Sequence, residues 1–172
     1  MPWEIEAPRI ESRESPREIL AADFKSLRGE LPIRGGWGYN QEDAVIIDKN
    51  DPVVPSGVPF DGVGIEYVFV EKRIYEELII FRPKHERCSG IKWKLLKQRL
   101  FENGGRSYDV LAFEVTAFLA KDFEELKAEW EGPNGHGSSG FDVDAHMKKA
   151  EARKLRYVTE YWFDITSFYG SK

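Results

Sequence analysis

The chain has 172 residues, of which 41% are hydrophobic and 13% are aromatic. This size and composition suffice for one domain with a sizeable core, so we expect a single domain over residues 1–172. Charged residues make up 32% and the formal net charge is −5, which disfavours nucleic acid as a bulk partner. Apolar runs stay far below the roughly 20 residues of a membrane span, and we expect no membrane contact.

The start of the chain and its cysteine content bear on the compartment. Met1-Pro2-Trp3-Glu4 lacks the positive and apolar regions of a secretory signal. Cys88 is the only cysteine and cannot form an internal disulfide, which agrees with a reducing environment. We therefore expect a cytoplasmic protein.

The first 48 residues predict an arm, a helix and a short strand. Residues 1–12 contain Pro2 and Pro8 without a clear period, and we expect an extended arm. Ser15-Pro16 is typical of a helix start, because serine caps the helix and proline suits its first position. The apolar stripe of that helix is Ile19, Leu20, Phe24 and Leu27, and Gly29 is placed to end it. The β-branched run over 44–48 predicts a strand.

A proline-containing loop and a second helix follow. Three prolines mark residues 49–62 as a loop. Apolar residues then recur every three or four positions, which predicts a helix buried along one stripe: Val63, Tyr67, Val70, Ile74, Leu78 and Phe81. Its other face is filled by Glu71, Lys72, Arg73, Glu76 and Glu77. The alternative is a strand over 65–70, where β-branched and aromatic residues dominate.

The second half predicts a hairpin, two helices and a closing strand. Ile91, Trp93 and Leu95 alternate with lysines, and Asn103-Gly104-Gly105 is typical of a hairpin turn. The return strand places on one face Leu111, Phe113, Val115 and Ala117. We expect a hairpin over about 91–118, a helix over 122–130, a flexible loop over 132–140, a helix over 142–154 and a strand over 156–168.

Together these elements predict an α+β fold. We expect a mostly antiparallel β-sheet, made of the hairpin over about 91–118 and the C-terminal strand, packed with about four helices. The second and third helices should cover one face of the sheet. Burial of apolar area there, at about 25 cal/mol per Å², would supply most of the stability.

The glycine-rich stretch Gly35-Gly36-Trp37-Gly38 is the first candidate site. Dinucleotide and P-loop signatures need glycines after a strand and before a helix, whereas these follow a helix and Pro32. A tight turn is the favoured interpretation. The alternative is a pocket rim that holds an anion, and its candidate ligand residues are Arg34, Trp37, Tyr39 and Asp43. We expect Asn40 and Asp43 to form a cap or turn rather than a catalytic pair.

The basic segment over 82–99 is the second candidate. It holds seven basic residues against Glu86 alone, a formal +6. Its candidate binding residues for phosphates or an acidic partner are Arg82, Lys84, Arg87, Lys92, Trp93 and Lys94. The favoured interpretation is a solvated strand whose lysines protect a sheet edge and pair with the acids over 122–131.

Two further patterns concern nucleophilic and metal chemistry. His85 and Cys88 stand three positions apart, but a catalytic cysteine also needs an orienting group, and lone cysteines are usually buried. Residue types that bind metals cluster at His136, Asp142, Asp144 and His146. An acid at a helix start is the simpler interpretation. We expect neither a metal nor a cofactor.

The expected function is a non-catalytic module of adaptor or immunity type that binds another protein. The opposite charges over 82–99 and 122–131 suit charge-complementary docking. One alternative is an enzyme or sensor that holds an anionic small molecule in a concave pocket between the turn over 34–39 and the basic segment. Another is a weak binder of single-stranded nucleic acid at Trp93 and its neighbouring lysines.

Overall fold

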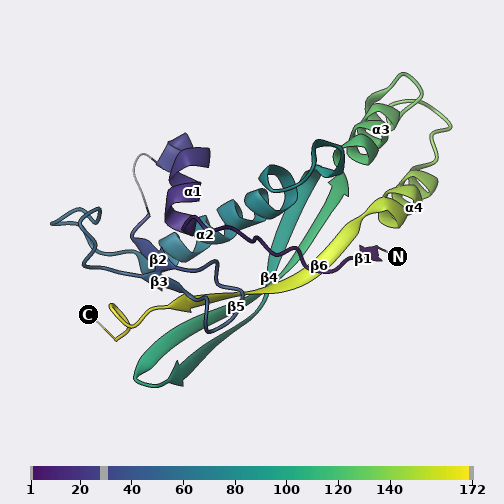
Figure 1. Cartoon of the computed structure of the whole chain (residues 1–172). Coiled ribbons are helices and arrows are strands. Elements are labelled where there is room, and N and C mark those ends of the chain that lie inside the picture. Colours follow the sequence, from purple (N-terminus) through teal and green to yellow (C-terminus); the bar gives the residue numbers. More distant parts are fainter. Residues whose placement is uncertain (1, 28–30, 171–172) are drawn as a thin grey trace.

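The computed structural model describes residues 2–27 and 31–170. The helical segments are α1 (Pro16–Asp23), α2 (Gly62–Tyr75), α3 (Ala120–Glu131) and α4 (Val143–Arg153), with the short turns η1 (Lys25–Leu27), η2 (Glu76–Ile80) and η3 (Lys84–Glu86). The strands are β1 (Trp3–Glu4), β2 (Ile33–Gly35), β3 (Val45–Ile47), β4 (Cys88–Asn103), β5 (Arg106–Leu119) and β6 (Leu155–Asp164). The predicted α+β class and the mostly antiparallel sheet are confirmed (Figure 1).

One mixed sheet joins all the described strands. Its order is β2-β3-β6-β5-β4, and β1 also pairs with β6. Strands β4 and β5 run antiparallel from the pair Cys88↔Leu119 to the pair Asn103↔Arg106. Between them Gly104 and Gly105 have φ values of 61° and 78°, a region that glycine enters without steric cost. In this order β4 forms one edge of the sheet and β2 the other.

Helix α2 lies across one face of the sheet (Figure 1). Its buried apolar side chains pack against the inner face of β5 and β6. The Phe69 ring meets Phe163 edge-on at 5.7 Å, and Phe113 meets Tyr161 edge-on at 5.5 Å. The core residues of these three elements are Phe69, Val70, Ile74, Leu111, Phe113, Val115, Ala117, Tyr157, Tyr161 and Phe163. The helix is thus observed, and the alternative strand over 65–70 is wrong.

The buried face of α2 is rotated from the predicted stripe. Val63 and Tyr67, which the period places inside, are 57% and 44% exposed. Arg73, Glu76 and Glu77, which the period places on the polar face, are at most 2% exposed. The period assumes that charged side chains face water, whereas this core supplies partners for Arg73 and Glu77, and burial raises the pKa of Glu76 to about 9.

Helix α3 does not cover this face, contrary to expectation. It lies with α4 at the end of the β4–β5 pair that is remote from the Gly104 turn (Figure 1). Its Phe123 ring packs against Phe118 at 6.0 Å. Gly90 lies beneath the same ring, where a β-carbon would come within 2.6 Å of it. Of the two helices expected over the sheet, α2 alone spans the described face.

Two segment boundaries differ from expectation, and the N-terminal arm takes part in the sheet. Helix α1 ends at Asp23, η1 follows it, and the predicted stop at Gly29 lies outside the described residues. Strand β6 ends at Asp164 instead of continuing to residue 168, because the Asp164 carboxylate accepts hydrogen bonds from Thr166 and turns the chain. The N-terminal arm packs, since β1 pairs with β6 and Ile10 is buried.

We expect Phe113→Ala to lower the free energy of unfolding by about 3–5 kcal/mol, because it leaves a cavity among packed rings. Phe113 is 2% exposed and touches the rings of Tyr67 and Tyr161. Urea unfolding followed by tryptophan fluorescence measures the loss. Val158→Ala on β6 is the control, since Val158 is 42% exposed. A loss for Phe113→Ala no larger than for this control would contradict the described core.

Candidate functional site

The glycine-rich stretch forms a tight bend between β2 and β3. Gly35 and Gly38 have φ values of 86° and 83°, and a β-carbon on Gly36 would lie 2.4 Å from the Asp43 carbonyl oxygen. Each conformation therefore favours glycine for a local steric reason. The Trp37 ring is 5% exposed and packs against Phe69 at 6.0 Å. This ring lies in the core.

The other candidates near this bend have separate positions. Arg34 is exposed on β2, opposite Ile46. Asn40 and Asp43 exchange side-chain to backbone hydrogen bonds of 2.7 and 3.1 Å, and these close a turn, one of the two predicted alternatives. Tyr39 lines a hollow of about 290 Å³ with the N-terminal arm, and its hydroxyl donates to Glu77 Oε2 at 2.6 Å.

That hydrogen bond belongs to a buried polar cluster around Arg73. The Arg73 guanidinium donates to the carbonyl oxygens of Trp37 and Glu160 at 3.2 and 3.0 Å, and to Thr159 Oγ1 at 2.9 Å. Its Nε lies 3.3 Å from Glu77 Oε2. The Tyr161 ring stacks on the guanidinium at 3.5 Å and the Tyr39 ring at 4.2 Å. Both charged side chains are fully buried, so this cluster fixes the core and offers no open site.

Arg34 and the basic segment of the anionic-ligand hypothesis lie at opposite edges of the sheet. Arg34 is on edge strand β2, and the basic segment leads into edge strand β4, while the bend returns to β6, where the Trp162 N–H donates to the Gly38 carbonyl oxygen at 2.8 Å. Three strands separate these edges, which is roughly 19 Å of sheet at about 4.8 Å per strand spacing. The fold does not bring Arg34 and Trp37 together with Lys92 and Lys94.

The basic residues over 82–99 remain largely in water. Lys84 and Arg87 are exposed before β4, and Arg82 donates to Cys88 Sγ at 3.5 Å. On β4, Lys92, Lys94 and Lys97 are exposed. Trp93 is half-buried and meets Tyr75 edge-on at 6.0 Å.

The expected pairing of these lysines with the acids of α3 is wrong. The acids of α3 pair instead with basic residues of α4. Arg153 contacts Glu125 at 2.9 Å and Asp122 at 3.5 Å, while Lys149 contacts Glu129 at 2.7 Å. The connection over 132–142 returns the chain so that the two helices lie side by side, and the nearer cations therefore neutralise these carboxylates.

Three of the four candidate metal ligands have another role, and the fourth, Asp144, is exposed in the first turn of α4. His136 stacks on Trp130 at 4.7 Å. Asp142 caps α4 by accepting from the Ala145 N–H at 3.0 Å. His146 Nδ1 lies 3.0 Å from Glu129 Oε1. Within the described residues, no group of three histidine, cysteine or acidic side chains is arranged to hold a metal.

Cys88 is a buried thiol. It is 4% exposed, and burial raises its pKa above the ordinary value although Arg82 lowers it. Its Sγ donates weakly to the Glu86 carbonyl oxygen at 3.8 Å. A raised pKa leaves little thiolate at neutral pH, which disfavours a nucleophile.

Two glutamates of the α2–η2 segment are buried beside other acids. Burial, and then the neighbouring Asp109, raises the pKa of Glu66 to about 9. Burial, and then Asp23, raises the pKa of Glu76 to about 9. Both side chains are therefore protonated at neutral pH. Asp109 also accepts two hydrogen bonds of 3.0 Å from the Gln98 amide on β4.

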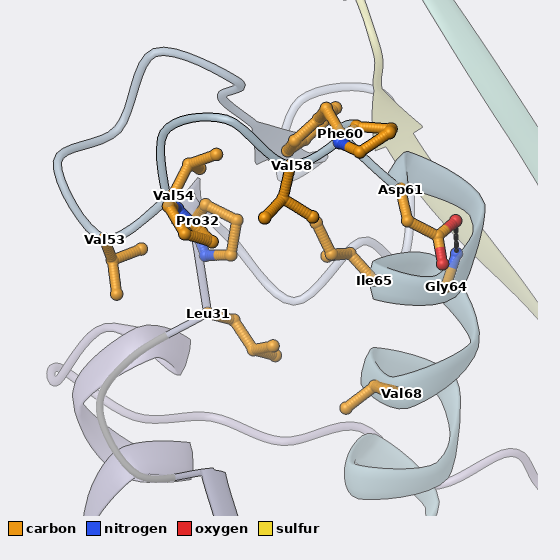
Figure 2. A pocket seen from close by; sticks show the side chains of 12 residues that line it. Leu31, Pro32, Val53, Val54, Val58, Phe60, Asp61, Gly64, Ile65 and Val68 are labelled. Carbon is orange, nitrogen blue, oxygen red and sulfur yellow. Dashed lines mark hydrogen bonds between the residues drawn. The ribbon is translucent and has the colours of Figure 1, made fainter.

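An apolar pocket opens beside the start of α2 (Figure 2). Its volume is about 350 Å³. The lining residues come from the segment before β2, the loop over 53–60 and the first turns of α2: Leu31, Pro32, Val53, Val54, Pro55, Val58, Pro59, Phe60, Asp61, Gly64, Ile65 and Val68. One feature of the sequence, three valines within a loop, could have indicated this pocket.

The loop that walls this pocket is attached at both ends. Asp51 pairs with Arg17 of α1 at 2.5 Å. Phe60 packs edge-on against Phe168 at 5.1 Å. These contacts hold the loop against α1 and the C-terminal segment, so the pocket is a defined feature of the fold.

Comparisons with protein-family models, curated proteins and solved structures gave no match to this chain. Among the described residues, no helix combines the length and apolarity needed to cross a membrane. The geometry of the chain itself therefore carries the functional argument.

Glu66→Gln should reduce the dependence of stability on pH. The pKa of Glu66 is about 9 in the folded state against 4.5 ordinarily, so between these values only the folded state holds the proton. The free energy of unfolding then falls as pH rises, by up to about 1.4 kcal/mol per pH unit. We expect the variant to lose less stability than the wild type between pH 5 and pH 8 in urea unfolding.

The exposed Glu124→Gln on α3 is the matched control. It removes one carboxyl outside the core and should keep the wild-type pH dependence. If the free energy of unfolding depended on pH equally in Glu66→Gln and in the wild type, Glu66 would not be protonated in the folded state.

Proposed function

We propose that the chain is a non-catalytic module that binds an acidic protein partner along edge strand β4. The observation that carries this is the centre of β4, where residues 94–98 are all exposed at the sheet edge. Leu95 and Leu96 are 37% and 46% exposed beside Lys94 and Lys97. Exposed leucines among lysines suit a surface that is both acidic and partly apolar.

The positive charge of β4 is poorly neutralised within the chain. Lys92, Lys94 and Lys97 have no ion pair among the described residues. Lys94 lies opposite Glu114 in the register, but Arg156 contacts the Glu114 carboxylate at 2.9 Å. An unneutralised patch of one sign attracts a partner of the other sign and raises the association rate.

Features of β4 favour contact through side chains over strand addition. Its register with β5 shifts between Ser89 and Lys92 and again between Leu95 and Lys97. Bulges and lysines both oppose pairing with another strand. A second copy docked edge to edge would place two basic strands together, so charge disfavours it. A different, acidic protein fits this edge better.

The proposal places this module in the cytoplasm. Support comes from the reduced and buried Cys88, which suits a reducing compartment.

The triple variant Lys92→Glu, Lys94→Glu and Lys97→Glu tests the proposal. The probe is a labelled peptide of alternating glutamate and leucine, titrated by fluorescence anisotropy at low salt. We expect the triple variant to bind it at least about tenfold more weakly than the wild type, because three attractive charges become repulsive. In NMR spectra of the wild type, the backbone amide signals that move when the peptide is added should belong to residues of β4.

A matched control separates the patch from overall charge. Lys121, Lys127 and Lys148 are exposed on α3 and α4, and their triple change to glutamate alters the net charge equally. This control should bind like the wild type. The proposal would be overturned if both triple variants bound the peptide equally weakly, or if the amide signals that move on peptide addition lay outside β4. Binding of oligothymidine in preference to the acidic peptide would also overturn it and favour nucleic acid.

A further inference from the structure

The pocket beside the start of α2 has the size and lining of a small-molecule site. Its volume of about 350 Å³ lies within the range of about 300–1,000 Å³ that is common for ligand pockets. The walls are valine, proline, leucine, isoleucine and phenylalanine side chains (Figure 2). Such a lining favours an apolar ligand body, which gains free energy by leaving water.

Asp61 supplies the one charged side chain among the described residues of this lining. Its Oδ1 accepts a hydrogen bond from the Gly64 N–H at 2.9 Å and so caps α2. Its Oδ2 has no hydrogen-bond or ion-pair partner among the described residues. Figure 2 shows this carboxyl beside Gly64, at the end of the pocket formed by the first turn of α2.

This carboxylate determines the charge of ligand that the pocket suits. Helix N-termini ordinarily attract anions, but here Asp61 already occupies that position. A ligand anion would meet a like charge next to apolar walls. A ligand ammonium would instead donate a hydrogen bond to Oδ2 and gain a charge-assisted contact.

We propose that this pocket binds a small amphiphilic amine. The apolar body, one or two rings in size, lies between Val54, Val58 and Val68, and the ammonium lies against Asp61. The site is separate from β4, since Leu31 and Pro32 precede the opposite edge strand. Amine binding and the partner binding proposed above are therefore independent of each other.

Three probes with one ring system test the ligand class. They are naphthylmethylamine, naphthylmethanol and naphthylacetate, which carry positive, neutral and negative heads at neutral pH. Affinities come from methyl NMR shifts of the full chain, with Val54, Val58 and Val68 as reporters. We expect the amine to bind about tenfold more tightly than the acetate, with the alcohol between them.

Asp61→Asn is the decisive variant. Asparagine caps a helix about as well as aspartate, so the fold stays intact while the charge is lost. The preference for the amine over the acetate should then fall to about threefold or less. Thermal unfolding checks that the variant remains folded.

A second pair of variants tests the cavity. Val68→Phe narrows the pocket from α2 and should abolish binding of the amine. Val63→Phe is its control on the same helix, because Val63 is 57% exposed and outside the lining. The proposal would be overturned if the three probes bound equally well, or if Asp61→Asn kept the preference for the amine. It would also be overturned if the NMR chemical-shift changes lay outside the pocket, or if the amine did not bind at millimolar concentration.

Discussion

The ion pair between Arg73 and Glu77 is the constraint on which the arrangement of the chain depends. Both side chains are fully buried, and burying a charge without a partner costs several kcal/mol. Here Arg73 donates to the carbonyl oxygens of Trp37 and Glu160, so one guanidinium joins α2 to the glycine bend and to β6. Phenol hydroxyls of Tyr39 and Tyr157 donate to Glu77. Removal of either charge would leave the other unpaired in the core.

This constraint also shapes the surface. Because Arg73 must face inward, α2 turns so that Val63 and Tyr67 lie outward. The helix then covers β5 and β6, while its contact with β4 includes the edge-on pair of Tyr75 and Trp93. The middle of β4 extends past this cover and keeps its leucines in water. The first turn of the same helix meets the loop over 53–60 and forms the apolar pocket.

Local patterns predicted elements better than orientations. The helical period identified the α2–η2 segment and three of its core residues, Val70, Ile74 and Leu78, because that period depends on neighbours along the chain. The rotation of α2 about its axis depends on Arg73 and on the tyrosines stacked on it, which are more than 30 residues away in the sequence. The pattern of a single helix does not contain these contacts. The glycine bend and the Asn40–Asp43 turn were predictable from local backbone chemistry. Strand β2, three residues with an arginine and a glycine, had no such signal.

Charge was predictable in amount but not in pairing. The basic run over 82–99 and the acids over 122–131 are evident in the sequence, yet only the fold shows that α4 neutralises those acids. The lysines of β4 are left without that partner. On the neighbouring strand β5, Asp109 lies next to Glu66 of α2 and contacts Gln98 of β4. Because burial keeps Glu66 protonated, it adds no second negative charge beside Asp109, and the positive potential that an acidic partner would meet on β4 is reduced less.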